Sequence, residues 1–322
     1  MTMISTSIEL AWDSAAKRVK HSPPNDDEFV VFPVAGGSAK GCYGGVDSEG
    51  HVLLGIEVDI APPQIEVRSA SLDFFRKPRK GLNSWLMFFR LRAAPLQPVF
   101  GRLCQDLIDE LQHTASDEEL LVVVQHRIAL WQKLFEIGPH GLLAEFQIKG
   151  LLAELLFIES QLKGPHRQPS EIVSAWLGPS GGDQDFMFSD VAIEIKAVGP
   201  HSEGVTISSL QQLESLIPIR LSIWTMRKSS ASEQASETLN SVIARLEERL
   251  SPHHHALALF RSALLEAGYV AHPYYSEIAF EPLRVEEHEV AGPFPRLTPS
   301  SIPAGIMSAT YCISLQHLRS RK

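Results

Sequence analysis

The hydrophobic pattern of the first third of the chain is typical of β-strands. Four runs rich in β-branched and aromatic residues lie between residues 29 and 92, separated by Gly and Pro: FVVFPV, HVLLGIEVDI, IEVRSASLDFF and WLMFFRL. A glycine-rich stretch, residues 36–45, lacks the Gly-Lys-Ser/Thr ending of a phosphate-binding loop, and no clear helix follows it. We therefore expect a β-rich region over residues 1–94, with residues 36–45 as a flexible connection.

Helical spacing of apolar residues replaces this pattern further along the chain. It predicts helices over residues 99–111, 117–135, 142–162 and 172–177. Ser116 and Glu119 have the spacing of a capping box at the start of the second helix. The residues that follow predict a hairpin (181–198), a third strand (205–208), a short helix (209–215) and a fourth strand (219–226). The predicted order from residue 142 is helix, three strands, helix, strand.

The last part of the chain mixes helices and strands. A Ser-rich loop precedes expected helices over residues 238–250 and 256–267, then expected strands within residues 274–290 and 309–315. We therefore expect an α/β protein in three parts. These are an N-terminal β-rich region (1–94), a helical lead-in with the core (95–230), and a C-terminal α+β extension that packs on the core (231–322).

The predicted hairpin, GGDQDFMFSDVAIEIKAV, carries an unusual density of opposite charge. If Ser189 and Asp190 form a two-residue turn, the register places Asp185 opposite Glu194 and Asp183 opposite Lys196. Because side chains alternate along a strand, the aromatic and β-branched residues point to the other face. One face is then apolar and the other holds the charges.

Two carboxylates directly across a strand pair are destabilising unless a cation lies between them. Mg²⁺ is commonly held by one or two carboxylates while it keeps several waters, so the pair Asp185 and Glu194 suits a divalent site. The alternative is a solvated strand face on which Asp183 pairs with Lys196 and Asp185 is merely exposed. The hairpin alone does not decide between them.

Glu154 is the exception in an otherwise apolar helix. Residues 150–158 are apolar on all sides, which is typical of a helix buried on most of its surface. A buried carboxylate is costly unless it is paired or bound to a metal. The competing interpretation is a glutamate that bonds a buried backbone group or an arginine. Glu145, by contrast, has Lys149 four residues on and is typical of an exposed helix pair.

Composition limits the classes of protein that remain. Across 322 residues, 44% hydrophobic and 21% charged content indicates an ordinary globular protein rather than a disordered or fibrous one. No apolar run has the length of a membrane span and residues 1–10 do not resemble an export signal, so we expect a cytoplasmic protein that does not bind membranes. Three distant cysteines match neither a disulfide framework nor a zinc site.

The net charge of −9 argues against bulk attraction to nucleic acid but allows a local basic patch. Two sets of residues are candidates for such a patch, although each is also typical of a solvated loop or chain end. They are Arg76, Lys77, Arg79 and Lys80, and the C-terminal Arg319, Arg321 and Lys322.

Glu154 on a core helix, Asp185 on the first hairpin strand and Glu194-Ile195-Lys196 on the second resemble the PD-(D/E)XK nuclease superfamily. The segments GLLAELLFI, WLGPSGGDQDF, IEIK and ISSLQQL are similar to a bacterial group of PD-(D/E)XK motif proteins associated with restriction and phage-defence loci. The resemblance covers residues 142–226 well and implies a restriction-endonuclease-like core with the order given above. No proline precedes Asp185, where Gln184 stands instead.

The resemblance also implies a mechanism. It assigns Asp185, Glu194 and the backbone carbonyl of Ile195 as ligands of Mg²⁺, which Mn²⁺ can replace, and Lys196 and Glu154 as further catalytic residues. The expected reaction is metal-dependent hydrolysis of a DNA phosphodiester bond. The backbone at the start of the helix after the third strand is expected to meet a phosphate, with contacts from Ser208, Ser209, Gln211 and Gln212.

Three alternatives remain. The sequence Gly-Pro-Ser-Gly-Gly from Gly178 matches a serine-hydrolase elbow, but such an elbow follows a strand and opens a helix, the reverse of the predicted order. The triple histidine from His253 precedes a predicted helix and is better read as a surface cap than as a zinc site. A catalytically silent nuclease fold that serves as a scaffold subunit in a defence complex is the second functional hypothesis.

Expected partners are DNA, other defence proteins such as a methyltransferase or an ATPase, and a second copy in a homodimer.

Overall fold

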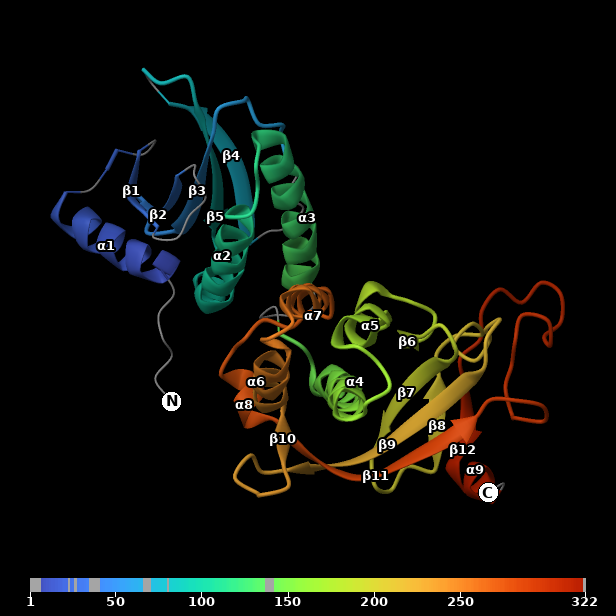
Figure 1. The fold of residues 1–322 in the computed structure, drawn as a ribbon. Helices are drawn as coiled ribbons and strands as arrows, with labels where there is room; N and C mark the ends of the chain where they lie inside the picture. The colour runs from blue at the N-terminus through green and yellow to red at the C-terminus, as the bar shows by residue number, and fades with distance from the viewer. Residues whose placement is uncertain are drawn as a thin grey trace. The chain divides into compact units, whose positions relative to one another are not determined.

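The computed structural model describes residues 7–22, 24–25, 28–34, 41–65, 71–79, 81–136 and 142–320. Contacts between residues divide the chain into two compact units, Met1–Leu142 and Leu143–Lys322. Figure 1 labels the helices and strands of both. The predicted carboxylates all lie in the second unit, and the β-rich region lies in the first.

The first unit contains a five-stranded antiparallel sheet in the order β1-β2-β3-β5-β4. Its strands are β1 (Phe29–Pro33), β2 (Cys42–Asp47), β3 (Val52–Val58), β4 (Leu72–Pro78) and β5 (Trp85–Leu91). Strand β2 begins inside the stretch that was expected to be a flexible connection, so that expectation is wrong for residues 42–45. Residues 36–40 of the stretch lie outside the described residues.

Close packing explains why glycines occur inside β2. A Cβ atom at Gly44 would lie 2.7 Å from the Cβ of Ala11, and one at Gly45 would lie 2.6 Å from the backbone oxygen of Val30. The glycines therefore let helix α1 (Ser7–His21) and strand β1 approach the sheet. Trp12 of α1 is buried and donates its indole N–H to the backbone oxygen of Leu53 at 2.8 Å.

The helices expected after residue 95 form much as predicted. A 3₁₀ turn, η1 (Ala94–Leu96), leads into α2 (Gln97–Leu111), and α3 spans Asp117–Glu136. Ser116 caps α3 by accepting the backbone N–H of Glu119 at 3.3 Å. The Glu119 carboxylate accepts the N–H of Ala115 at 2.8 Å, one residue before the position of an ideal capping box.

The second unit contains a mixed five-stranded sheet in the order β10-β11-β9-β7-β6. Its strands are β6 (Phe186–Met187), β7 (Ala192–Val198), β9 (Ile219–Ser229), β10 (Glu237–Thr238) and β11 (Ala279–Glu289). Strand β7 runs parallel to β9, and the other pairs are antiparallel. Strand β11, from the region predicted as a C-terminal extension, therefore pairs directly with a strand of the predicted core.

Helices cover this sheet and hold it in place. They are α4 (Glu145–Lys163), α5 (Pro169–Ser174), the 3₁₀ turn η2 (Gly178–Ser180), α6 (Leu239–Leu250), α7 (His254–Glu266), α8 (Tyr274–Glu277) and α9 (Leu315–Arg319). Helix α4 contacts β7 (Figure 1). Its Phe157 packs against Phe186 of β6 with ring centroids 4.7 Å apart. None of the helices in the described part of the chain is long and apolar enough to cross a membrane.

The three predicted strands occur in the expected order along the chain, but the third lies in another sheet and the helix expected after it does not form. Strand β8 (Gly204–Ile207) does not join the main sheet but pairs with β12 (Tyr311–Ser314). Residues 209–215 form bends and a turn instead of a helix. Ile207, Leu210 and Leu213 are buried three residues apart, which imitates helical spacing, but so short a segment lacks the length to stabilise a helix.

Replacing Leu221 with Ala should destabilise the second unit by about 2–5 kcal/mol, because a buried leucine leaves a cavity when it is truncated. Leu221 is 0% exposed in the central strand β9. The matched change Leu283→Ala in β11, where the leucine is 44% exposed, should cost less than about 1 kcal/mol. Urea unfolding followed by circular dichroism measures both, and equal losses would contradict this difference in burial.

Candidate functional site

The predicted register of the hairpin is confirmed. Phe186 pairs with Ile193 and Met187 with Ala192, and the N–H of Phe188 donates to the oxygen of Val191 at 3.0 Å. The same register continued by one residue brings Asp185 opposite Glu194.

Asp185 stands just before the first strand residue and is held by its backbone and its side chain. Its backbone oxygen accepts the N–H groups of Leu177 and Gly178 at 2.8 and 3.1 Å. Its Oδ2 accepts the N–H of Ile195 at 2.7 Å. The carboxylate thus takes the place of a backbone acceptor one residue before strand β6 begins. The other oxygen, Oδ1, remains available to a ligand.

Glu194 and Lys196 meet on the charged face of β7. The Lys196 Nζ lies 2.6 Å from Oε1 of Glu194 and 3.1 Å from Oε1 of Gln212. Glu194 is only 1% exposed, and its Oε2 is buried with no hydrogen-bond partner among the described residues. Asp183 is exposed. The hairpin is therefore not the solvated strand face of the alternative interpretation.

Helix α4 brings Glu154 to the same place. Its Oε2 accepts the indole N–H of Trp176 at 2.7 Å. A Cβ atom at Gly178 would lie 2.9 Å from Oε2 of Glu154 and 3.0 Å from Oδ1 of Asp185. Both carboxylates therefore lie against Gly178, where any side chain would crowd them.

The cluster perturbs the protonation of its own members. Burial, followed by the negative charge of Asp185, raises the pKa of Glu154 to about 8 and the pKa of Glu194 to about 8. Burial also raises the pKa of Asp185, against the hydrogen bond from Ile195 and the charge of Lys196. Such buried, mutually repelling carboxylates are typical of functional sites.

A divalent cation fits this donor set. Hard cations such as Mg²⁺ prefer carboxylate and carbonyl oxygens, and the cluster offers both, with one buried glutamate oxygen left without a partner. In the part of the chain described, no three His, Cys, Asp or Glu side chains are grouped as a ready-made metal site. Two carboxylates and the Ile195 carbonyl, the ligands implied by the resemblance, do not require a third such side chain.

The four residues predicted to bind nucleic acid lie on the turn after β8. Gln212 accepts the N–H of Ser208 at 2.8 Å, and Ser209 Oγ accepts the N–H of Gln212 at 3.3 Å. The Gln211 side chain is exposed. Because no helix forms here, the expected anion site at a helix N-terminus is wrong, and the Ser208 N–H is used within the turn. Gln212 instead reaches Lys196.

Sequence reasoning missed three residues that shape the site: Trp176, Gly178 and Gln184. Gln184 is 3% exposed, and its side-chain nitrogen donates to backbone oxygens of the turn. The only signal in the sequence was a polar residue directly before Asp185 in place of proline. Trp176 was expected in a helix but lies after α5 and forms an isolated bridge with Phe186. Its hydrogen bond to an acid 22 residues earlier leaves no pattern in the sequence.

The competing catalytic motifs do not form. Ser180 lies in the 3₁₀ turn η2 after helix α5, and its hydroxyl donates to the oxygen of Leu177 at 2.9 Å. His253 precedes the first residue of α7, and the three histidines are exposed at this helix start. The elbow interpretation is thus excluded by its local structure. The histidines lie on the surface at the helix start, as expected, but His253 makes no capping hydrogen bond with its side chain.

The candidate basic patches are occupied by contacts within the protein. Arg76 donates to the backbone oxygen of Pro62, Lys77 lies 4.5 Å from the ring centroid of Phe29, and Arg79 pairs with Glu57 at 2.5 Å. Arg319 of the C-terminal set pairs with Glu286 at 3.0 Å. Lys80, Arg321 and Lys322 lie outside the described residues. These cations do not favour a nucleic-acid surface.

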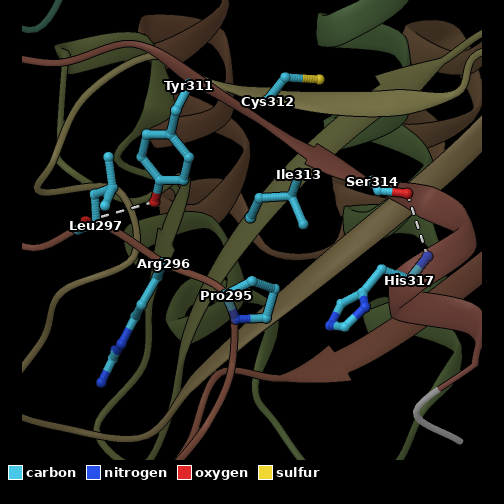
Figure 2. A pocket seen from close by; sticks show the side chains of 8 residues that line it. All are labelled: Pro295, Arg296, Leu297, Tyr311, Cys312, Ile313, Ser314 and His317. Atoms are coloured by element: carbon cyan, nitrogen blue, oxygen red, sulfur yellow. Dashed lines mark hydrogen bonds between the residues drawn. The ribbon is translucent and has the colours of Figure 1, made fainter.

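A cavity of about 490 Å³ lies beside β12 in the second unit (Figure 2). Its lining residues are Pro295, Arg296, Leu297, Tyr311, Cys312, Ile313, Ser314 and His317. None of them is a predicted site residue. Arg296 nevertheless touches the turn that carries Gln212, because its Nη1 donates to the oxygen of Leu213 at 2.7 Å.

Without divalent metal, the free energy of unfolding should fall as the pH rises from about 4.5 to about 8. The folded pKa of Glu194 lies above its ordinary value, so the folded state keeps a proton that the unfolded chain releases in this range. Glu194→Gln removes one such group, which should flatten the dependence and raise the Tm at pH 8 by roughly 2–4 °C. Calorimetry across this pH range measures both.

The same variant tests the cation. Mg²⁺ or Mn²⁺ should raise the Tm of the wild type at pH 8 and leave that of Glu194→Gln almost unchanged. Glu248→Gln, at an exposed position of α6, provides the matched control and should behave as wild type. A Glu194→Gln protein with the pH slope and metal response of the wild type would contradict the assigned role.

Comparison with known proteins agrees with this geometry. No curated protein and no solved structure matches the chain. A family model described as "Putative PD-(D/E)XK family member, (DUF4420)" matches residues 43–316, which is most of the chain. The protein therefore belongs to this PD-(D/E)XK family.

Proposed function

We propose that the protein is a metal-dependent endonuclease that hydrolyses phosphodiester bonds of DNA. The observation that carries this proposal is the convergence of Asp185, Glu194 and Lys196 on one hairpin, with a buried glutamate beside the lysine ammonium. Family membership supports a nuclease, and the local chemistry supports the choice of these three residues.

Asp185, Glu194 and the carbonyl of Ile195 would hold the cation. The hydrogen bond from Ile195 occupies Oδ2 of Asp185 and so directs Oδ1 toward the other carboxylates. When bound, a Mg²⁺ or Mn²⁺ ion supplies Lewis-acid polarisation of the phosphate and lowers the pKa of a bound water. Its positive charge would also offset the burial and the repulsion by Asp185 that together raise the pKa of Glu154 and of Glu194.

Lys196 supplies the positive charge that the protein itself contributes. Its ammonium is held between Glu194 and Gln212, which leaves a third donor to orient a water molecule or a phosphate oxygen. A fixed charge of this kind stabilises the negative charge that develops on the phosphate in the transition state. Glu154 extends the acidic cluster on the side of α4, through water or a second ion.

The biological setting rests on the resemblance. We place this nuclease in a restriction or phage-defence system of the cytoplasm, with DNA as substrate and a methyltransferase, an ATPase or a second copy of the chain as partner. The turn with Ser208, Ser209, Gln211 and Gln212 lies beside Lys196 and is our candidate for contact with the DNA backbone.

Purified protein with Mg²⁺ or Mn²⁺ should nick or cut plasmid or phage DNA, and Lys196→Ala should lower the rate by on the order of 10²–10³-fold. Agarose gel assays of supercoiled plasmid measure this directly. Lys163→Ala is the matched control, because Lys163 is 60% exposed in a surface pair with Glu159 and should not affect cleavage.

The scaffold hypothesis predicts a different result. If wild type and Lys196→Ala behave alike across metals and substrates, including with candidate partner proteins present, the protein acts through binding rather than through hydrolysis.

A further inference from the structure

Gln184 is a buried amide whose donor group faces one turn of the backbone. Its Nε2 donates to the oxygen of Gln211 at 2.7 Å and to that of Glu214 at 3.0 Å, with a longer contact of 3.5 Å to Gln212. An amide nitrogen carries two hydrogens, so the two short contacts use both of them. The side chain therefore ties the turn after β8 to the residue directly before Asp185.

The turn that Gln184 holds carries the partner of Lys196. Oε1 of Gln212 accepts the Lys196 ammonium at 3.1 Å and the backbone N–H of Ser208 at 2.8 Å. Two donors saturate the two lone pairs of this oxygen and fix its position. The direction of the lysine ammonium thus depends on where the turn places Gln212.

The turn needs side chains to hold it, because residues 209–215 form no helix. From the C-terminal segment, Arg296 donates to the oxygen of Leu213 at 2.7 Å and Thr310 to that of Ser208 at 3.2 Å. Arg296 belongs to the wall of the cavity in Figure 2. Gln184 alone among these three donors is adjacent in sequence to a predicted metal ligand.

Packing alone does not explain this residue. A buried amide costs free energy unless it is hydrogen-bonded, and an apolar side chain of similar shape would fill the same space without that cost. What an apolar side chain cannot do is hold two backbone oxygens of the turn at a fixed distance from Asp185.

We propose that Gln184 is a positioning residue, which holds the turn at residues 208–214 so that Gln212 aims the ammonium of Lys196 toward the carboxylates. Asp185 and Lys196 are thereby held in one hydrogen-bonded unit. The catalytic consequence rests on the proposed nuclease function, but the geometry itself can be tested without any cleavage assay.

The test measures how readily Lys196 reacts with an amine-directed acylating reagent, by mass spectrometry of the full-length protein after digestion. Gln184→Met keeps the shape and removes the donors, and Gln212→Leu removes the acceptor of Lys196. Each should raise labelling of Lys196 by roughly three- to tenfold, because the Lys196 nitrogen loses a hydrogen bond that restrains it and is then easier for the reagent to reach. Lys163, which is 60% exposed, serves as the internal reference.

The double variant separates a shared path from two independent effects. If Gln184 acts through Gln212, Gln184→Met combined with Gln212→Leu should label no faster than either single variant. Gln234→Met, in an exposed loop, is the matched control and should label as wild type. Wild-type labelling in Gln184→Met, or multiplied effects in the double variant, would overturn the proposal.

Circular dichroism and Tm establish that each variant is folded before labelling. If Gln184→Met does not fold, Gln184→Asn keeps the donor on a shorter stem. It should raise Lys196 labelling in the same direction by a smaller factor, and wild-type labelling in this variant would equally overturn the proposal.

Kinetics then connect the geometry to the reaction. In a protein that cleaves DNA, Gln184→Met should lower kcat while the affinity for Mn²⁺ stays unchanged, because the metal ligands are intact. If Gln184→Met lowers both the affinity for Mn²⁺ and the Tm, the role of Gln184 is merely structural and the proposal is wrong. Absence of cleavage in the wild type, with the predicted labelling pattern intact, would count against the nuclease function only.

Discussion

The buried carboxylate of Glu194 is the constraint on which the second unit depends. Ionising a carboxyl group at a position with 1% exposure is costly unless positive charge lies beside it, and among the described residues the protein itself supplies only Lys196 at this distance. Asp185 adds to the problem, since its charge raises the pKa of Glu194 further. The surrounding fold holds these groups together at a cost that a bound cation would offset.

Each neighbouring element serves this arrangement. The parallel pairing of β7 with β9 buries the strand that carries Glu194, and α4 covers it while bringing Glu154. The short strand β6 begins only after Asp185, and the side chain of Asp185 bonds the backbone of β7. Gln184 and Gln212 connect the hairpin to the turn, so that the acidic side chains and Lys196 belong to one hydrogen-bonded network.

Much of the site followed from local patterns that the sequence displays. The hairpin register was predictable because alternation and a two-residue turn leave few choices, and β7 and β6 pair as expected. Glu154 was predictable because a lone acid in an apolar helix needs a partner, and the helix does bring it to Asp185. The hairpin register depends on residues close together in sequence. The inference on Glu154 depends on an acidic residue in a helix that is otherwise apolar.

What escaped prediction depends on distant contacts. The spacing of Ile207, Leu210 and Leu213 suited a helix, yet Ile207 and Leu213 are buried in a cluster with residues of β12 and of the main sheet. Gln184 contacts backbone oxygens 27 and 30 residues away, and nothing local distinguishes it from an exposed glutamine. The glycines of β2 suggested a loop because the segments that pack against them, α1 at Gly44 and β1 at Gly45, lie outside the glycine-rich stretch.

Gly178 gives the acidic cluster a built-in size limit. A methyl group at this position would stand within van der Waals overlap of both Glu154 and Asp185, so even alanine would occupy the space where their oxygens converge. The backbone of η2 therefore lies on the side of the cluster where Glu154 and Asp185 meet. A side chain added there would force at least one of the two carboxylates to move.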